Sequence, residues 1–427
     1  MPGAPTPETS AIGFGSDAEP RERTWWSRPG LDVRQGRLRI AGRDAEALAR
    51  THGTPLYVYD LVRIEEQATS IRDALAGAGV RGLIRLALKA QRESEVLAFV
   101  RDRCPWVGID ACSPGEVEWA LRHGWAPPEV SFTGTNVSER DLDVIVGSGV
   151  HVNVDLPSQL DRLGRRAPRS AVGLRVNPRI GASYAGQQQT KYAGVRPTKF
   201  GFFAEQLPDA VRNARAHGMT IDTVHFHVGD GYLNDGLAVF AESVSRVADM
   251  VRTLVDAGCP IREVNTGGGL GVPYRAGDGT LDVKAWAAIL AEHLGPFDVV
   301  VATEPGDFLT KECGVLLAEV VTKEERDGLL FAGVDAGWNQ ACERFVYGDP
   351  FEVVVCRAAD AGPAREVTVA GNINEGDDLF AEDQPLPDFG EGDVLAILGA
   401  GSYNASMASE HCLRPPAAAV AFAERVS

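Results

Sequence analysis

The sequence predicts an α/β protein in which a (β/α)8 barrel is followed by a C-terminal all-β domain. Eight short β-rich runs alternate with helical patterns before about residue 310, and eight is the number of strands in such a barrel. After about residue 310, strand-like runs follow one another through turns, with few helical stretches. Spacing alone does not distinguish a closed barrel from an open, doubly wound sheet.

The first 25 residues lack the apolar core of a signal peptide, so we expect them to form a disordered leader. Residues 26–50 include a strand-like run at 37–40 and are expected to join the β-domain. The expected barrel spans 51–310, and the β-domain spans 311–427.

Each predicted element rests on its apolar pattern. The expected barrel strands are 82–89, 106–110, 129–134, 150–155, 171–177, 222–227, 263–266 and 298–304. Helical spacing occurs between them, for example at 93–102, 114–124, 138–146 and 241–258. The expected strands of the second domain are 315–322, 329–335, 351–358, 366–370, 393–398 and 417–423, and a further strand is expected at 56–60.

Composition excludes several classes of protein. The formal net charge is −17, from 42 Lys and Arg against 59 Asp and Glu, which argues against electrostatic nucleic-acid binding. No apolar run is long enough for a transmembrane helix, so no membrane partner is expected. Seven scattered cysteines without a CxxC pair argue against a disulfide framework or a structural zinc site. We expect a cytoplasmic enzyme without a bound metal.

Polar residues close several predicted strands, at the barrel end where active sites form. Any one of them could be a solvated side chain or a turn residue, and the closely spaced His225 and His227 could also be a metal pair. Gly267–Gly271 directly follows a strand, and its backbone could approach a phosphate or form a flexible loop. The sequence has no P-loop and no GxSxG motif. A strand-end lysine, imidazole and carboxylate beside a phosphate loop suggest pyridoxal phosphate. The strand-end residues are Lys89, Asp110, Arg175, Asn177, His225, His227 and Glu304.

The order of these motifs resembles that of the fold-type III pyridoxal phosphate enzymes, specifically the diaminopimelate/ornithine decarboxylase family. The resemblance extends from residue 53 to residue 409 and implies an alanine racemase-like barrel, a β-domain and a homodimer with shared active sites. The matching segments are 87–90, 109–116, 175–178, 199–201, 225–229, 267–271, 304–306, 335–337 and 399–403.

The resemblance also implies roles for individual residues. Lys89 would carry the cofactor as a Schiff base, His227 would stack on its ring, and Glu304 would pair with the pyridine nitrogen. Glu375 would contact a substrate amine. The residues that we expect to be catalytic are Lys89, His227 and Glu375. The expected cofactor-binding residues are Lys89, Asp110, Arg175, His227, Gly229, Gly267, Gly268, Gly269, Gly271, Glu304, Gly306 and Tyr403.

Four positions depart from the family pattern. Asn374 stands where the family has a cysteine that protonates the reaction intermediate, and an amide is no acid at neutral pH. His411, Cys412, Cys342 or water would then supply the proton. Asp307 and Glu343 replace two arginines, and Asp230 replaces a serine beside the phosphate. The expected substrate-binding residues are Asp307, Glu343, Tyr347, Asn374, Glu375 and Tyr403.

Because two guanidinium positions are now carboxylates, we expect a substrate without a free distal carboxylate. The predicted reaction is the decarboxylation of a basic or modified diamino acid, free or bound to a carrier protein. The alternatives are diaminopimelate decarboxylation, an amino-acid racemase or epimerase, and an inactive regulator that binds pyridoxal phosphate.

Overall fold

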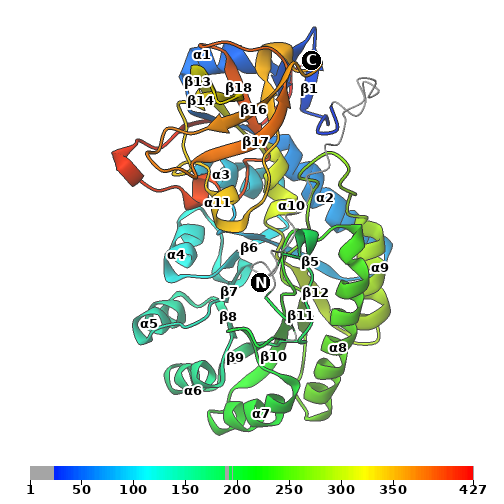
Figure 1. Ribbon diagram of the computed structural model, residues 1–427. Coiled ribbons are helices and arrows are strands. Elements are labelled where there is room, and N and C mark those ends of the chain that lie inside the picture. The colour runs from blue at the N-terminus through cyan, green and yellow to red at the C-terminus, as the bar shows by residue number, and fades with distance from the viewer. Residues whose placement is uncertain (1–23, 188–191, 195, 427) are drawn as a thin grey trace, which may run out of the picture.

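The computed structural model describes residues 24–187, 192–194 and 196–426. Eight parallel strands close into a barrel, so the alternative of an open sheet is excluded. The helices surround the barrel, and the β-rich domain lies at one end of it (Figure 1). The barrel strands are β5 (Gly82–Ala87), β6 (Val107–Ala111), β7 (Val130–Thr133), β8 (His151–Val154), β9 (Ala171–Arg175), β10 (Thr220–His225), β11 (Glu263–Asn265) and β12 (Val300–Thr303).

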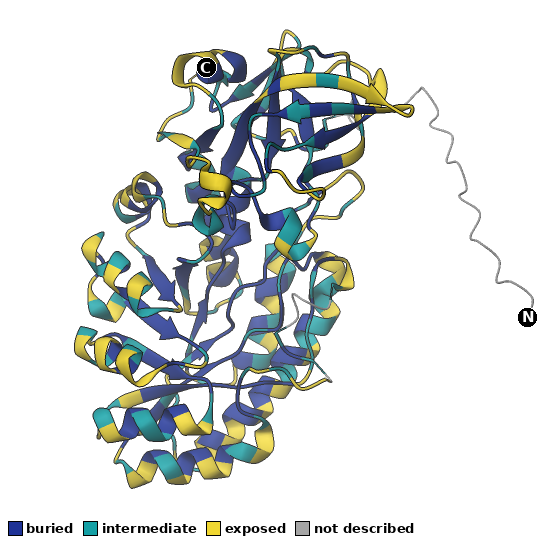
Figure 2. Ribbon diagram, turned by 60° about the vertical axis from the view of Figure 1, so that its left-hand side comes forward, coloured by how far each residue is buried: buried dark blue, intermediate teal, exposed yellow. Residues whose placement is uncertain are grey.

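The barrel helices bury one side and expose the other, as Figure 2 shows. The start of α4 illustrates how the sequence sets a boundary: Ser113 accepts a hydrogen bond from the Glu116 N–H at 3.2 Å, and Pro114 occupies the first turn. The larger helices are α2 (Leu61–Gly77), α3 (Ser94–Arg103), α4 (Pro114–Arg122), α5 (Glu139–Ser148), α6 (Pro157–Arg166), α7 (Leu207–Ala216), α8 (Leu237–Asp256) and α9 (Val283–Leu294).

The second domain is built on the long strand β13, which pairs with β4, β14 and β18. The sheet continues through β15 on one side and through β16 and β17 on the other, while β19 pairs with β4. Its strands are β4 (Leu56–Asp60), β13 (Gly314–Arg326), β14 (Leu329–Val334), β15 (Val353–Val355), β16 (Arg365–Ala370), β17 (Leu379–Leu386), β18 (Val394–Leu398) and β19 (Ala418–Phe422).

Several boundaries differ from those expected. The barrel was expected from residue 51, but β4 pairs with β13 and β19, so its backbone hydrogen bonds belong to the second sheet. Strand β17 was not predicted, because its alternation is interrupted by charged residues and Pro385. Only Val353–Val355 of the expected strand 351–358 is extended, and a 3-10 turn follows it.

The N-terminal segment forms a small sheet of its own, made of β1 (Leu31–Arg34), β2 (Arg37–Ile40) and β3 (Arg43–Asp44), and α1 (Ala45–His52) follows it. Its buried residues, including Trp26 and Leu38, share an apolar cluster with Val315 and Ala396 of the β-domain. Of the expected leader, residues 1–23 lie outside the described residues, and Thr24 begins a turn that Ser27 closes.

The β-domain reaches the barrel mouth through the segment after β18. The Tyr403 N–H donates to the Ala90 carbonyl at 2.9 Å, and the Gln91 side chain donates to the Gly401 carbonyl at 2.9 Å. These contacts bring the two domains together beside the end of β5. Across the described ranges, no helix is long and apolar enough to cross a membrane.

Candidate active site

A buried carboxylate forms the floor of a cavity at the barrel mouth. Glu304 follows β12, and its two oxygens accept hydrogen bonds from His225 Nε2 at 3.0 Å and from Asn265 Nδ2 at 2.5 Å. Burial alone raises the pKa of Glu304, but His225, Arg85 and Asn265 together lower it to about 2. Glu304 is therefore held as an anion inside the protein.

Lys89, directly after β5, enters the same cavity. Its ammonium nitrogen lies 5.6 Å from the centroid of the Tyr192 ring, and that ring stacks on His227 at 4.5 Å between centroids. Burial, Lys89 and Arg175 keep the pKa of His227 well below its usual value, so its imidazole is neutral. Burial raises the pKa of Asp110 well above its ordinary value, and the charge of Glu304 adds to this effect.

The glycine-rich loop after β11 offers a backbone surface. In the described residues, the N–H groups of Gly268 and Gly269 have no protein acceptor. A Cβ on Gly268 would lie 2.4 Å from the Glu304 carbonyl oxygen, and one on Gly269 would lie 2.2 Å from that of Gly229. Only glycine therefore allows this backbone to line the cavity.

Most of the predicted cofactor residues meet in one place. Arg175 lies beside the cavity, with a guanidinium nitrogen 3.7 Å from Asp155 and its guanidinium carbon 4.2 Å from the centroid of the Phe200 ring. Gly229, Gly267 and Gly271 belong to the adjoining backbone rather than to the cavity surface. The cavity is lined by Ala87, Lys89, Asp110, His227, Asp230, Gly268, Gly269, Glu304, Gly306 and Tyr403.

Beside this floor lies a group of four buried or nearly buried carboxyl groups around one ammonium, which we call the acidic wall: Asp230, Asp307, Glu343 and Asp349 around Lys311. The Lys311 ammonium binds Glu343 and lies 3.6 Å from Asp307. Asp307 and Glu343 were expected to face a substrate, and instead they share the Lys311 ammonium.

Further hydrogen bonds fix the acidic wall. Asp307 accepts from the Ser402 hydroxyl at 2.5 Å and from the Tyr274 hydroxyl at 3.1 Å. Glu343 accepts from the Asn404 amide at 3.2 Å. One ammonium does not neutralise four buried carboxyl groups, and protonation relieves the excess charge. Burial accordingly raises the pKa of Asp230 to about 7 and that of Glu343 to about 8.

Two of the predicted substrate residues and the candidate proton donors lie away from the cavity in this chain. Asn374 and Glu375 occupy an exposed loop, where Glu375 accepts from the Trp338 indole at 3.2 Å and pairs with His411 at 2.8 Å. Cys412, next to His411 in the sequence, is exposed. Cys342 is buried beneath Tyr403, and burial raises the pKa of its thiol to about 11. None of these side chains lines the cavity.

Tyr403 lines the cavity, and Tyr347 packs against it from outside. The Tyr347 and Tyr403 rings meet edge to face, with their centroids 6.1 Å apart. A Cβ on Gly306 would lie 3.0 Å from the Tyr403 hydroxyl, which places that hydroxyl directly over the turn after Glu304. Burial keeps the pKa of Tyr403 well above its ordinary value, so the hydroxyl remains a donor.

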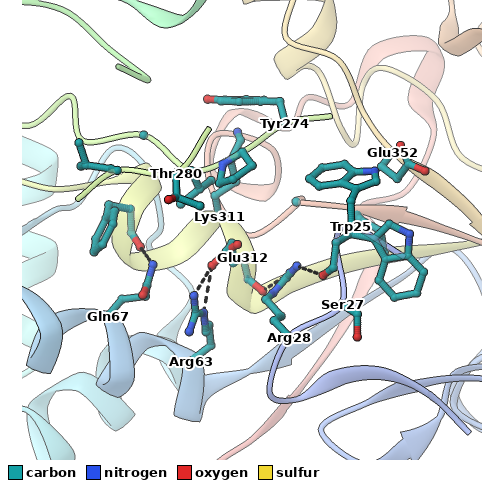
Figure 3. Close-up of a pocket in the computed structure, with 18 of the residues that line it drawn as sticks. Trp25, Ser27, Arg28, Arg63, Gln67, Tyr274, Thr280, Lys311, Glu312 and Glu352 are labelled. Atoms are coloured by element: carbon teal, nitrogen blue, oxygen red, sulfur yellow. Dashed lines mark hydrogen bonds and ion pairs between the residues drawn. The ribbon is translucent and has the colours of Figure 1, made fainter. Parts of the chain in front are cut away.

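A larger cavity lies behind the acidic wall, between the N-terminal segment, α2 and the β-domain (Figure 3). Its polar side chains are largely paired with the protein. Arg63 binds Glu312, and Arg28 donates to the carbonyls of Trp26 and Glu312. Lys311 and Tyr274 line this cavity too, and thus connect it to the acidic wall.

Comparison with known proteins identifies the family. The family model described as the pyridoxal binding domain of pyridoxal-dependent decarboxylases matches residues 61–311. The chain belongs to this decarboxylase family. It is 35% identical over 402 residues to a diaminopimelate decarboxylase of Methanothermobacter thermautotrophicus, covering 92% of each chain. It is 33% identical to one of Streptomyces coelicolor, covering 86% of this chain and 84% of that one.

Solved structures agree with this assignment. A diaminopimelate decarboxylase from M. jannaschii, described in co-complex with L-lysine, superimposes with a TM-score of 0.83 at 25% identity, covering 92% of each chain. One from Helicobacter pylori, complexed with L-lysine, gives 0.81 at 26% identity and covers 89% of this chain and 94% of that chain. The protein is a pyridoxal phosphate-dependent amino-acid decarboxylase with the fold that the sequence predicted.

The cavity residues suit this cofactor. Asp110 Oδ1 and His227 Nδ1 are buried without a hydrogen-bond partner in the described structure, and the free amides of Gly268 and Gly269 can donate to a phosphate. When bound, pyridoxal phosphate supplies an electron sink for the electrons that carbon dioxide leaves behind. Lys89 could hold it covalently, and Glu304 could keep its ring nitrogen protonated.

Three features of the site were not predicted from the sequence. His225 and Asn265 hold Glu304, and both end barrel strands, which was the available signal. Tyr192 stacks on His227 from a long connection in which no strand or helix was predicted. Lys311 follows Asp307 by one helical turn, a spacing that could have predicted their proximity.

Proposed function

We propose that this enzyme decarboxylates an amino acid whose distal end carries an amine or a modified, uncharged group rather than a free carboxylate. The acidic wall carries this proposal. A distal carboxylate would lie near four carboxyl groups, and the one cation that the described part of the wall contains is already bound to Glu343. Burying a further unpaired anion there is costly, whereas an ammonium would be compensated.

A neighbouring arginine does not restore the missing positive charge. Arg344, next to Glu343, points to the surface and binds Glu382 at 2.8 Å. Its guanidinium is therefore committed outside the site. The charge reversal predicted at positions 307 and 343 thus has no compensation among the described residues other than Lys311.

Six residues of the cavity have a role in the proposed reaction. Lys89 would hold the cofactor covalently and would be displaced from it by the substrate amine, which prepares the substrate for carbon dioxide loss. Glu304 keeps the pyridine nitrogen protonated, and the neutral His227 offers a flat ring for stacking. Gly268, Gly269 and Tyr403 hold the phosphate side.

The family names favour a second candidate, diaminopimelate itself, because the relatives at 30–35% identity carry that name. The distal end of diaminopimelate bears both an amine and a carboxylate. The two candidate substrates therefore differ in the distal carboxylate, which is the group that the acidic wall would repel.

We propose a homodimer in which the exposed loop with Glu375 and His411 enters the partner's site. Two observations support this: the pair is fixed by Trp338, which stacks on His411 at 5.1 Å, and the adjacent Leu413 is 89% exposed. Seven free cysteines favour a reducing, cytoplasmic setting.

The test is carbon dioxide release from the protein loaded with pyridoxal phosphate. The panel contains meso-diaminopimelate, both enantiomers of lysine and ornithine, L-arginine, and amide-linked diamino acids. Release from a substrate without a distal carboxylate supports the proposal and names the class. Release from meso-diaminopimelate above all others contradicts it. If the whole panel is silent, the proposal for free amino acids is wrong, and a substrate bound to a carrier protein becomes the next one to assay.

A further inference from the structure

Asp230 is an acidic residue beside the glycine-rich loop of this site. It lines the same cavity as Gly268, Gly269 and Lys89, on the loop after β10. That loop packs directly against the glycine-rich loop, since the Tyr232 N–H donates to the Gly269 carbonyl and the Gly271 N–H donates to the Tyr232 carbonyl, both at 3.0 Å. The carboxyl group therefore lies beside the free amides to which a phosphate would bind.

A carboxylate at this position would repel a phosphate dianion. Two anions in contact in a buried site are costly, and one of them then retains a proton. One oxygen of Asp230 is turned back to its own loop, where the Gly231 N–H donates to it at 3.1 Å. If the carboxyl group is protonated, its O–H becomes a donor, and donors are what a phosphate requires.

The surroundings of Asp230 favour its neutral form. Burial raises the pKa of Asp230 to about 7, the acids Asp307 and Asp349 add to the effect, and Lys89 and Lys311 oppose it. Lys311 is occupied by Glu343, which limits its effect on Asp230. The other titratable groups that face Asp230 or share its cavity are Asp110, His227, Tyr232, Tyr274, Glu304, Tyr347 and Tyr403.

We propose that Asp230 binds in its protonated form beside the cofactor's phosphate and donates a hydrogen bond to it, so that loading of pyridoxal phosphate takes up a proton at this residue. The proton comes from solvent, and no covalent bond changes at Asp230. This inference concerns the cofactor: it shares Asp230 with the acidic wall, but its test measures cofactor binding and needs no substrate. It makes Asp230 a determinant of cofactor affinity.

The experiment measures the dissociation constant of pyridoxal phosphate for the apo-protein between about pH 6 and about pH 9, by equilibrium dialysis in phosphate-free buffers. Pyridoxal, which lacks the phosphate, is the matched ligand because it shares the aldehyde and the ring nitrogen. The second ionisation of a phosphate monoester lies near about pH 6, below most of this range. A difference between the two ligands therefore reports on the phosphate site.

The wild-type affinity for pyridoxal phosphate should fall by about tenfold per pH unit above about pH 7, relative to the affinity for pyridoxal. Asp230→Asn should remove this relative loss and bind the cofactor at least about tenfold more tightly than the wild type at about pH 8.5. Asp230→Ser provides a second neutral variant should the amide fold poorly. Asp235→Asn, at an exposed position of the same connection, should behave like the wild type.

Calorimetry in two buffers of different ionisation enthalpy counts the protons directly. On binding pyridoxal phosphate at about pH 8, the wild type should take up about one more proton than Asp230→Asn does. On binding pyridoxal, the two proteins should take up the same number of protons. The proposal is overturned if both neutral variants fold and retain the wild-type pH dependence, or if their proton uptake equals that of the wild type.

Discussion

The floor of the cavity and its acidic wall handle buried negative charge in opposite ways. On the floor, a single carboxylate, Glu304, receives hydrogen bonds from His225 and Asn265, and its pKa is lowered. In the wall, four carboxyl groups share Lys311, and the pKa values of Asp230 and Glu343 are raised. A fixed anion suits a constant partner such as the ring nitrogen, whereas an under-compensated wall suits a cationic or uncharged substrate group.

The two regions are also built from different parts of the chain. The floor uses residues at the ends of barrel strands, whose positions are fixed by the sheet. The wall combines Asp230, from the loop after β10, with Asp307 of α10 (Asp307–Thr310) and Lys311 of the 3-10 turn η5 (Lys311–Cys313). Its other two members, Glu343 of α11 (Glu343–Tyr347) and Asp349, come from the β-domain. The floor is thus built on the barrel, and the wall is built where the barrel meets the β-domain.

The largest effect is expected from Lys89→Ala, which removes the nucleophile while leaving both regions intact. Carbon dioxide release should fall by about 10⁴-fold or more, because no other lysine lines the cavity in the described structure. Lys284→Ala, at an exposed position in α9, is the matched control and should retain full activity. A Lys89→Ala enzyme with substantial turnover would disprove the assignment of the floor.

Lys311→Met tests the wall through stability. It leaves Asp307 and Glu343 buried without their cation, so the free energy of unfolding should fall by about 3–5 kcal/mol in urea denaturation. Adding Glu343→Gln should restore part of the loss, because the amide carries no charge. An unchanged midpoint for the single variant would show that the wall is not an electrostatic unit.

Glu304→Gln tests the floor. The amide retains the size of the side chain but cannot hold a proton on the ring nitrogen, so kcat should fall by roughly 10²–10³-fold. Binding of pyridoxal phosphate should change less, since the phosphate side is untouched. Equal losses in kcat and in cofactor affinity would mean that Glu304 serves mainly to bind.

The pH dependence of stability distinguishes the two regions most finely. The raised pKa of Glu343 means that the folded apo-protein holds a proton that the unfolded chain has lost, so stability should fall as the pH rises towards about 8. The slope is at most about 1.4 kcal/mol per pH unit for one group. Glu343→Gln should flatten it, as measured by urea denaturation at several pH values.

The contribution of Glu304 to the pH dependence of stability has the opposite sign. Its lowered pKa stabilises the fold above the ordinary glutamate pKa, and this contribution is lost only as the pH falls towards about 2. Glu304→Gln should therefore remove a contribution that is lost at acid pH, whereas the loss of stability towards about pH 8 that Glu343 causes should persist. If Glu304→Gln and Glu343→Gln changed the slope of stability against pH in the same way, the division into floor and wall would be contradicted.

Much of this architecture was predictable from the sequence. All eight barrel strands were expected near their observed places, because parallel strands buried on both faces produce near-continuous apolar runs. Strand β17 was missed, since Glu382, Asp383 and Pro385 disguise its alternation. The pairing of β4 with β13 was missed because it joins residues more than 250 positions apart in sequence.

The active site also has a part that was predictable from the sequence and a part that was not. Residues at strand ends, such as Lys89 and Glu304, were predictable because strand order fixes their place. The wall was not, since the binding of Glu343 to Lys311 depends on how a second domain packs against the barrel. The sequence singled out Asp307 and Glu343 as candidates, and only the packing showed that they share one ammonium.

The most direct test of the wall's role in specificity is the ratio of kcat/KM for L-lysine, or another free diamino acid, to that for meso-diaminopimelate, measured with the same enzyme preparation. The acidic wall predicts that the substrate without a distal carboxylate is favoured by about tenfold or more. A preference for meso-diaminopimelate would show that the wall accepts a carboxylate, and would contradict the claim that its uncompensated charge selects the substrate.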